Sequence, residues 1–366
     1  MAPFTPAQPR RTIRDAAPYN GLVNVSDLGE FGLIDRLAAA VGAARPESLI
    51  VGIGDDAAAW RLGDAVVLAT TDTLVEGVHF PPGLAPWPDL GWKALAVNVS
   101  DIAAMGGTPQ FALVTLALPP ETPVEDVDEL YAGLRECSEE YGVAVVGGDV
   151  VRASQAVISM AVMGHAERES GGPPQRLRRA AARPGYVIAV TGSLGDSAAG
   201  LRRLKDGAST DDPLVRAHLR PQPPLAAGRQ AAHLGVPCAI DVSDGLLQDL
   251  GHICEPCGLG AVVRAEALPL SQELRRAFPA DALSLACTGG EDYQLVFIAP
   301  QETMRLLRAS ANVPLTVIGE MDEHPEQRPR LMDESGQEMR LPAGRQGVPG
   351  AGWDHLRSDD RPSGRA

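Results

Sequence analysis

The chain has 366 residues, of which 45% are apolar, and a formal net charge of −15. Its length and composition are typical of a globular protein of two domains. The acidic balance argues against a nucleic-acid binder, which needs a basic face, and no apolar run approaches the ~18 residues of a membrane span. Five cysteines without a disulfide pattern favour a reducing, cytoplasmic compartment.

Composition also marks the two ends of the chain and one internal boundary. Residues 1–26 and 357–366 are rich in Pro, Arg, Ser and Gly, so we expect a disordered N-terminal extension and a disordered tail. The internal string "RESGGPPQR", residues 168–176, separates two apolar segments. We therefore expect one domain over residues 27–168 and a second over residues 177–356.

The N-terminal domain alternates strand and helix patterns. Short apolar runs bounded by turn residues predict strands at residues 48–54, 65–71, 111–119, 143–148 and 156–165. Apolar residues at helical spacing predict helices over residues 89–106 and 124–142.

The C-terminal domain has the same character. Strands are predicted at residues 186–192, 238–242, 261–266 and 293–300, and helices over residues 197–207 and 245–254. One α/β layer per domain is the simplest interpretation. The pair Cys254 and Cys257 is interpreted as packing at a helix end, the alternative being a metal or redox site.

Aspartates recur where predicted strands end. A single Asp in such a place is more often a turn former or a helix N-cap, but that interpretation weakens with each repetition. Ligands of open α/β sheets bind outside strand carboxyl ends, so we expect these side chains to converge. They are Asp55, Asp56, Asp72, Asp149, Asp241 and Asp244, joined by Asp101 at the end of a predicted helix.

Several carboxylates in one cleft repel one another, so they require cations. Oxygen-only ligands select hard ions such as Mg²⁺, which bridges carboxylates and nucleotide phosphates. The string Gly52-x-Gly54-x-x-Ala57 matches a dinucleotide fingerprint, but its Asp55 and Asp56 would repel a bare pyrophosphate. We therefore interpret this loop as a metal-binding turn and predict several Mg²⁺ ions.

Phosphate groups need further partners, because the chain has no P-loop and only two lysines, Lys93 and Lys205. One candidate is "VTGSLGDSAAGL", residues 190–201, where a Gly-rich turn precedes a predicted helix. Its N–H groups suit a phosphate, and an ordinary capped turn fits the string equally well.

Seven strings together resemble the thiamine-monophosphate kinase family of the aminoimidazole ribonucleotide synthetase-like superfamily. They are "GIGDDAA", "TTDTLVEGVHF", "KALAVNVSDIAAMGG", "VGGDVVR", "TGSLGDSAAGL", "DVSDGLLQDLGHI" and "GGEDYQLVF", over about residues 27–356. The resemblance implies the two-domain fold of that superfamily, with the sheet of the first domain forming a barrel in a homodimer. It implies ATP-dependent phosphorylation of thiamine monophosphate to thiamine diphosphate, without a nucleic-acid or membrane partner.

The resemblance also implies roles for individual residues. Asp72, Asp101 and Arg179 are expected to be catalytic, and ATP contacts are expected at Gly148, Asp149, Arg179 and Ser243. Substrate contacts are expected at His79, Glu291 and Trp353. The expected metal ligands are Asp56, Thr70, Thr71, Asp72, Asp101, Asp149, Asp241 and Asp244.

Several of these residues also have an ordinary structural interpretation. His79 could cap its own loop, and Glu291 could be a turn residue before a strand. Arg178 or Arg183 could take the place of Arg179, and Trp353 could be an unrelated surface aromatic. His252 is interpreted as a packing residue.

Two other functions remain open at this point. One is a different ATP-dependent small-molecule enzyme of the same superfamily, and the other is a non-catalytic sensor of Mg²⁺ and nucleotide. The acceptor phosphate of the kinase reaction is already ionised near neutral pH, which agrees with the lack of a recognisable nucleophile and base pair.

Overall fold

The computed structural model describes residues 24–41, 46–166, 177–324 and 326–341. The helix α1 (Val25–Ala40) belongs to a compact unit of its own. Its first turn is capped by Asp27, whose carboxylate accepts the backbone N–H of Asn24. The described elements from β1 onward form one other compact unit. The expected disordered ends fall almost wholly outside the described residues.

The N-terminal part of this unit is built on a six-stranded sheet with the order β1-β2-β3-β6-β4-β5. Neighbouring strands are antiparallel, except that β4 and β5 are parallel. The strands are β1 (Leu49–Val51), β2 (Ala58–Leu62), β3 (Ala65–Val75), β4 (Gly107–Leu118), β5 (Ala144–Arg152) and β6 (Val157–Ala166).

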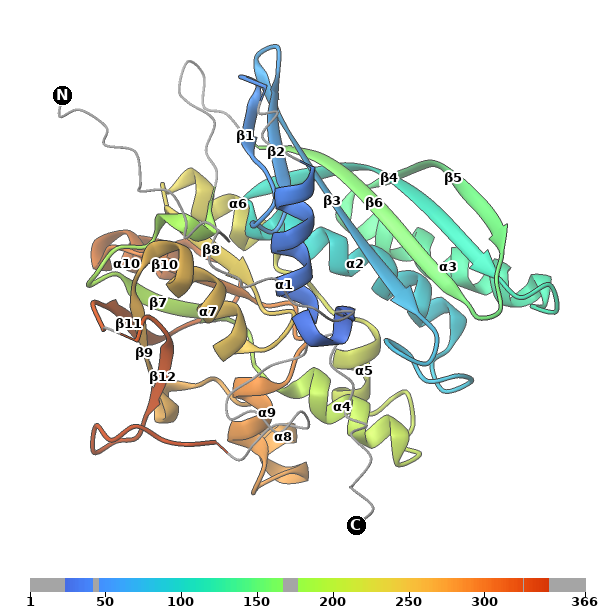
Figure 1. Ribbon diagram of the computed structural model, residues 1–366. Helices are drawn as coiled ribbons and strands as arrows, with labels where there is room; N and C mark the ends of the chain where they lie inside the picture. Colours follow the sequence, from blue (N-terminus) through green and yellow to red (C-terminus); the bar gives the residue numbers. More distant parts are fainter. Residues whose placement is uncertain (1–23, 42–45, 167–176, 325, 342–366) are drawn as a thin grey trace. The chain divides into compact units, whose positions relative to one another are not determined.

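Helices α2 (Trp87–Ala104) and α3 (Val124–Tyr141) cover one face of this sheet (Figure 1). Side chains of β4 and β6 alternate between buried and less buried positions, as expected for a sheet with one covered face. The edge strand β5 is exposed along its whole length. The second face of the sheet is therefore open at β4 and β5.

The C-terminal part contains a second six-stranded sheet with the order β12-β9-β11-β7-β10-β8. Its neighbours are antiparallel, except that β12 and β9 are parallel. The strands are β7 (Val187–Thr191), β8 (Cys238–Asp241), β9 (Gly260–Arg264), β10 (Leu295–Ala299), β11 (Leu315–Asp322) and β12 (Pro329–Met332).

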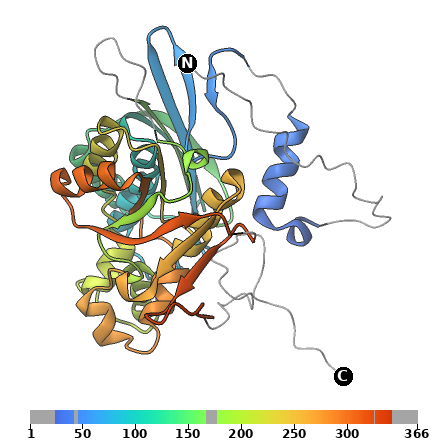
Figure 2. The same ribbon diagram turned by 90° about the vertical axis from the view of Figure 1, so that its left-hand side faces the viewer.

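Helices pack on both faces of the second sheet (Figure 2). One apolar cluster joins it to α7 and α9, and another joins it to α6, α10 and the last turn of α2. The α-helices of this part are α4 (Asp196–Lys205), α5 (Pro213–Leu219), α6 (Leu225–His233), α7 (Leu246–Cys257), α8 (Gln272–Ala277), α9 (Ala282–Thr288) and α10 (Gln301–Ser310). Two 3-10 turns, η1 (Arg179–Ala181) and η2 (Ala265–Ala267), complete it.

All the predicted strands and helices are confirmed, with shifts at their ends. The prediction that Asp72 and Asp149 follow strands is wrong: β3 and β5 continue past these residues, so both lie inside strands. The sheets are mostly antiparallel, with one parallel pair of strands in each. The strand β2 follows the Gly52–Gly54 turn, which excludes the dinucleotide interpretation because that motif needs a helix there.

No described helix combines the length and apolar character needed to cross a bilayer. All five cysteines carry free thiols. Cys254 is buried in α7 and Cys257 ends that helix, in agreement with the interpretation of this pair as packing at a helix end.

The crossing of α2 and α3 predicts opposite effects for two glycine substitutions. An added Cβ at Gly133 in α3 would lie 1.7 Å from the backbone oxygen of Pro88, whereas one at Gly251 in α7 meets nothing within 4 Å. We expect Gly133→Ala to destabilise the protein by about 1–3 kcal/mol and Gly251→Ala to stabilise it by about 0.4–1 kcal/mol. Urea unfolding measures both, and equal effects of the two variants would contradict the close helix crossing.

Candidate active site

Three aspartates from distant parts of the sequence meet in one cluster. Asp56 lies in the turn after β1, Asp101 in the last turn of α2 and Asp241 at the end of β8. One carboxylate oxygen from each lies within 4.8 Å of the others. Asp56 and Asp241 are 8% and 1% exposed. Like charges this close repel strongly when water is excluded, so the cluster must be neutralised by protons or cations.

Hydroxyl groups support two members of the cluster. Thr70 Oγ1 donates a hydrogen bond of 2.5 Å to Asp101 Oδ2, and Ser100 Oγ donates one of 2.7 Å to Asp241 Oδ2. Ser100 and Asp101 are neighbours in α2, so this helix contributes to both contacts. These bonds orient the carboxylates but add no positive charge.

The only ion pair that the described residues give the cluster comes from Arg179. Its Nη2 lies 2.5 Å from Asp56 Oδ1, and its backbone N–H donates to the carboxylate of Asp55. Arg178 and Arg183, the alternatives to Arg179, are both exposed, and Arg179 is the one that pairs with Asp56. Asp56 Oδ2 is buried and has no hydrogen-bond partner among the described residues. One oxygen of the cluster is therefore open to a further ligand.

The pKa values follow from this crowding. Burial, together with Asp72 and Asp241, raises the pKa of Asp101 well above its usual range. Burial and Asp56 raise the pKa of Asp241 to about 8, although Ser100 and Arg179 oppose the shift. The metal-free cluster therefore retains protons at neutral pH.

The remaining predicted metal ligands lie at different places. Asp72 is on the same side of β3 as Thr70 and adds its charge to the cluster. The side chain of Thr71 points to the other face of the sheet, where its hydroxyl donates to the backbone oxygen of Met160. Asp149 is exposed on β5, and its carboxylate accepts the backbone N–H of Val150. The structure thus brings Asp72 to the cluster and leaves the side chains of Thr71 and Asp149 outside it.

Gly148, a predicted ATP contact, has a structural reason to be glycine. An added Cβ would lie 1.8 Å from the backbone oxygen of Val114 in β4. The role of Gly148 in nucleotide binding stays a prediction, because close strand packing already requires a glycine there.

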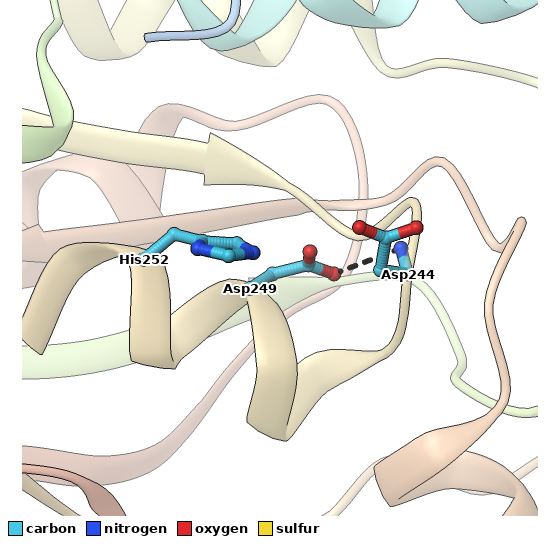
Figure 3. A group of neighbouring side chains, drawn as sticks. All are labelled: Asp244, Asp249 and His252. Atoms are coloured by element: carbon cyan, nitrogen blue, oxygen red, sulfur yellow. Dashed lines mark hydrogen bonds between the residues drawn. The ribbon is translucent and has the colours of Figure 1, made fainter. Parts of the chain in front are cut away.

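Asp244 belongs to a second group, shown in Figure 3 with Asp249 and His252 of α7. One ligand atom from each lies within 4.8 Å of the others. Asp249 Oδ2 accepts hydrogen bonds from the backbone N–H groups of Asp244 and Gly245, so it stabilises the backbone at the start of α7. Sequence reasoning missed Asp249 and gave His252 a packing role. Their spacing of three residues, which places both on one helix face, was the available signal.

His79 and Glu291, two predicted substrate contacts, lie within electrostatic range of each other. His79 Nδ1 accepts the backbone N–H of Val75, so the side chain does cap its own loop. Glu291 Oε1 forms an ion pair of 2.9 Å with Lys93, a residue that sequence reasoning left without a role. Trp353, the third predicted substrate contact, lies outside the described residues.

The structure decides between the two interpretations of residues 190–201. The carboxylate of Asp292 accepts the backbone N–H groups of Gly195 and Ser197 at 2.7 and 3.1 Å. The N-terminus of α4 is therefore filled by a side chain of the protein. This contact opposes the phosphate-binding interpretation of the turn, and the cap comes from Asp292 rather than from the expected Ser or Asp of the turn itself.

Comparisons with known proteins identify the family of this chain. The family model described as AIR synthase related protein, N-terminal domain, matches residues 54–166, and the model of its C-terminal domain matches residues 183–331. The chain is 36% identical over 308 residues to the thiamine-monophosphate kinase of Aquifex aeolicus, covering 82% of this chain and 94% of that protein. It is 40% identical over 308 residues to that of Escherichia coli K12, covering 80% and 90%.

The chain belongs to the thiamine-monophosphate kinase family. The resemblance and the two-domain fold class that it implied are thereby confirmed. The solved structure of AaThiL complexed with AMPPCP and TMP matches with a TM-score of 0.77 and 32% identity, covering 91% of this chain and 99% of that one. Several of the strings that resemble the thiamine-monophosphate kinase family fall on the turn after β1, on β3 and on α2, which carry the acidic cluster.

The raised pKa values predict how pH affects the metal-free protein. The pKa of Asp241 is about 8 in the folded state, against its ordinary 3.8, so the folded state holds the proton more tightly. The contribution of this group to stability is complete below about pH 4 and declines as pH rises toward 8.

Urea unfolding with a chelator between pH 5 and 8 tests this expectation. Asp241→Asn cannot ionise, so its stability should fall less with rising pH than that of the wild type. Parallel pH profiles of the two proteins would show that Asp241 is not protonated in the folded state.

Proposed function

We propose that this chain transfers the terminal phosphoryl group of ATP to thiamine monophosphate, forming ADP and thiamine diphosphate. Membership of the thiamine-monophosphate kinase family supports this, as does the relative that was solved with AMPPCP and TMP. The observation that carries the proposal is the buried cluster of Asp56, Asp101 and Asp241. Buried carboxylates can bind cations, and cations stabilise the negative charge of phosphate groups during transfer.

We further propose that Mg²⁺ ions bind at this cluster. The donors are all hard oxygen atoms, and Asp56 Oδ2 is buried without a hydrogen-bond partner among the described residues. Asp56, Asp101, Asp241 and the nearby Asp72 would hold the ions, with Thr70 beside them. Bound Mg²⁺ supplies charge neutralisation and orientation to the phosphates. Asp244 of the second group, and Thr71 and Asp149 outside both groups, remain proposed ligands.

The side chains of the protein have to position the reactants rather than remove a proton. The acceptor is a phosphate monoester with a second pKa of ≈ 6, so its oxygen is already ionised at neutral pH. Arg179 forms an ion pair with Asp56 in this structure, and a guanidinium group is also a strong partner for phosphate. We propose ATP contacts at Arg179, Ser243, Gly148 and Asp149, with Asp72, Asp101 and Arg179 as the catalytic residues.

The acceptor contacts are proposed at His79, Glu291 and Trp353. The charge of His79 lowers the pKa of Glu291, so these two residues are within electrostatic range of each other. Glu291 and Asp101 both raise the pKa of Tyr293 through their charges, so Glu291 and the acidic cluster share this neighbour. The thiazolium ring of the substrate is a cation, which suits an acidic residue and an aromatic face.

A direct assay tests the reaction. The full chain, ATP and Mg²⁺ are incubated with thiamine monophosphate, and ADP and thiamine diphosphate are measured together; unphosphorylated thiamine and an unrelated phosphate monoester serve as control acceptors. We expect both products only with thiamine monophosphate. Tight Mg-ATP binding without any product would indicate a sensor, and product with another acceptor would indicate a different enzyme of the superfamily.

Asp101→Asn separates a catalytic role from a structural one. We expect its kcat to fall by at least about a hundredfold, as is usual when charge at a reacting phosphate is lost. The metal-free melting temperature should hold or rise, because Asn cannot ionise and so avoids the cost of placing a further negative charge in the buried cluster. Asp128→Asn, at an exposed position of α3, is the matched control. Parallel losses of folding and activity would support a structural role only.

We also propose that two copies of the chain pair through the open face of the first sheet. On the open face the exposed apolar side chains are Phe111 and Leu113 of β4 and Val151 of the edge strand β5. The same edge strand also exposes Val145, Val146 and Val150. A long apolar edge strand is a template for pairing with another chain. A second copy offers the same surface about a twofold axis.

Leu113→Lys tests the dimer, because a charge at the centre of a buried apolar interface prevents association. We expect a dimeric wild type and a monomeric variant by light scattering. Leu306→Lys, at an exposed leucine of α10, should leave the mass unchanged. A monomeric wild type would refute the proposed pairing.

We place the protein in the cytoplasm. Its five thiols are free and four are buried. Burial raises the pKa of Cys254 and Cys287 to about 12, so these thiols are protonated and unreactive. Such a set of cysteines suits a reducing compartment in which ATP is available.

A further inference from the structure

Lys93 is a buried lysine near the proposed site. It lies in the second turn of α2, and its side chain is 3% exposed. Its ammonium group forms an ion pair of 2.9 Å with Glu291 Oε1. A buried ammonium ion is costly without a counter-charge, so the position of Lys93 depends on Glu291 and that of Glu291 on Lys93.

The second oxygen of Glu291 is also engaged. Oε2 lies 3.4 Å from Nδ1 of the buried His218 in α5, and the same nitrogen shares a hydrogen bond of 3.0 Å with Ser197 Oγ of α4. Burial and Lys93 lower the pKa of His218 to about 3, so the ring is neutral at neutral pH. Lys93 is therefore the residue that balances the charge of Glu291 at this contact.

Glu291 belongs to a loop, residues 289–293, with an unusual backbone. Glu291 and Tyr293 have φ values of 65° and 50°, in the left-handed region that side chains other than glycine disfavour. Such residues cost of order 1–3 kcal/mol each and persist only where neighbouring contacts enforce them. The ion pair with Lys93 is one such contact.

The loop is joined by backbone hydrogen bonds to the segment that follows β8. Glu291 N–H donates to the oxygen of Ser243, and Tyr293 N–H donates to that of Val242. Val242 and Ser243 lie between Asp241 and Asp244 in the chain, and each of these aspartates belongs to one of the two acidic groups. A shift of the loop would therefore move the segment that carries the proposed nucleotide contact and both flanking aspartates.

We propose that Lys93 is a positioning residue: through its ion pair with Glu291 it holds the loop 289–293, and the loop in turn holds Ser243 and the flanking aspartates in place. This inference rests on the proposed function, because it assigns Lys93 to the binding of Mg-ATP. It also means that Glu291 meets the substrate as a carboxylate already paired with a cation.

Three variants test the ion pair. Lys93→Met keeps the length of the side chain and removes its charge, and Lys93→Arg keeps the charge. The double variant Lys93→Met with Glu291→Gln removes both charges, so it leaves no unpaired buried ion if Lys93→Met alone does not fold. Lys205→Met, at the other lysine of the chain, is the control because Lys205 is exposed, although its charge also lowers the pKa of His218.

Two quantities are measured below the melting temperature of each variant: the Mg²⁺ concentration for half-maximal rate, and the Kd of AMPPCP with Mg²⁺ by calorimetry. We expect Lys93→Met and the double variant to raise the Mg²⁺ concentration for half-maximal rate and the Kd of AMPPCP by about tenfold or more. An effect of this size lies in the range of interaction energies between residues of one hydrogen-bond or ion-pair network. Lys93→Arg should stay within about threefold of the wild type, and Lys205→Met should match it.

A merely structural role would lower only the folded fraction, leaving both quantities unchanged in the molecules that fold. That result, or a double variant with wild-type Mg²⁺ and AMPPCP binding, would overturn the proposal. A wild type without kinase activity would refute the proposed reaction instead, and the calorimetric comparison of the variants would still decide the role of Lys93.

Discussion

The mutual repulsion of buried carboxylates is the constraint on which this structure depends. Two unit charges at ~4 Å repel by about 4 kcal/mol at an effective dielectric of 20. The cluster of Asp56, Asp101 and Asp241 faces this cost with one guanidinium, from Arg179, and two hydroxyl donors. A fold gains no stability from such a site. If the cluster binds the cations proposed for phosphoryl transfer, stability and function oppose each other there.

The helix α2 connects the two sheets to this site. Nearly all of its residues are buried, since it packs on the first sheet and its last turn joins the apolar cluster of the second. Ser100 and Lys93 are seven residues apart, so they lie on one face of the helix, ~10 Å apart along its axis. One contacts Asp241 and the other Glu291. A single rigid element thus sets two separate contacts with the C-terminal part of the chain.

Sequence patterns predicted most of the strands and the helices α2, α3, α4 and α7, because apolar periodicity reports which face of a strand or helix is buried. They gave no prediction for β2, β11, β12 or the other helices. They misplaced the ends of β3 and β5, since a polar residue such as Asp72 within a strand resembles a turn signal. They also could not show that Asp292 fills the N-terminus of α4. The carboxylate and the helix start are nearly a hundred residues apart, and no local pattern links them.

The sequence alone indicated the family, many of the strands and helices in chain order, and a set of aspartates that we propose as cation ligands, because these follow from local composition and motif wording. Only the tertiary structure decided which aspartates meet. It joined Asp56, Asp101 and Asp241, assigned Asp244 to a separate group with Asp249 and His252, and left Asp149 on an exposed strand. It also paired Lys93 with Glu291. The physical reason is that charge interactions depend on distance in space, which chain folding sets and sequence separation does not.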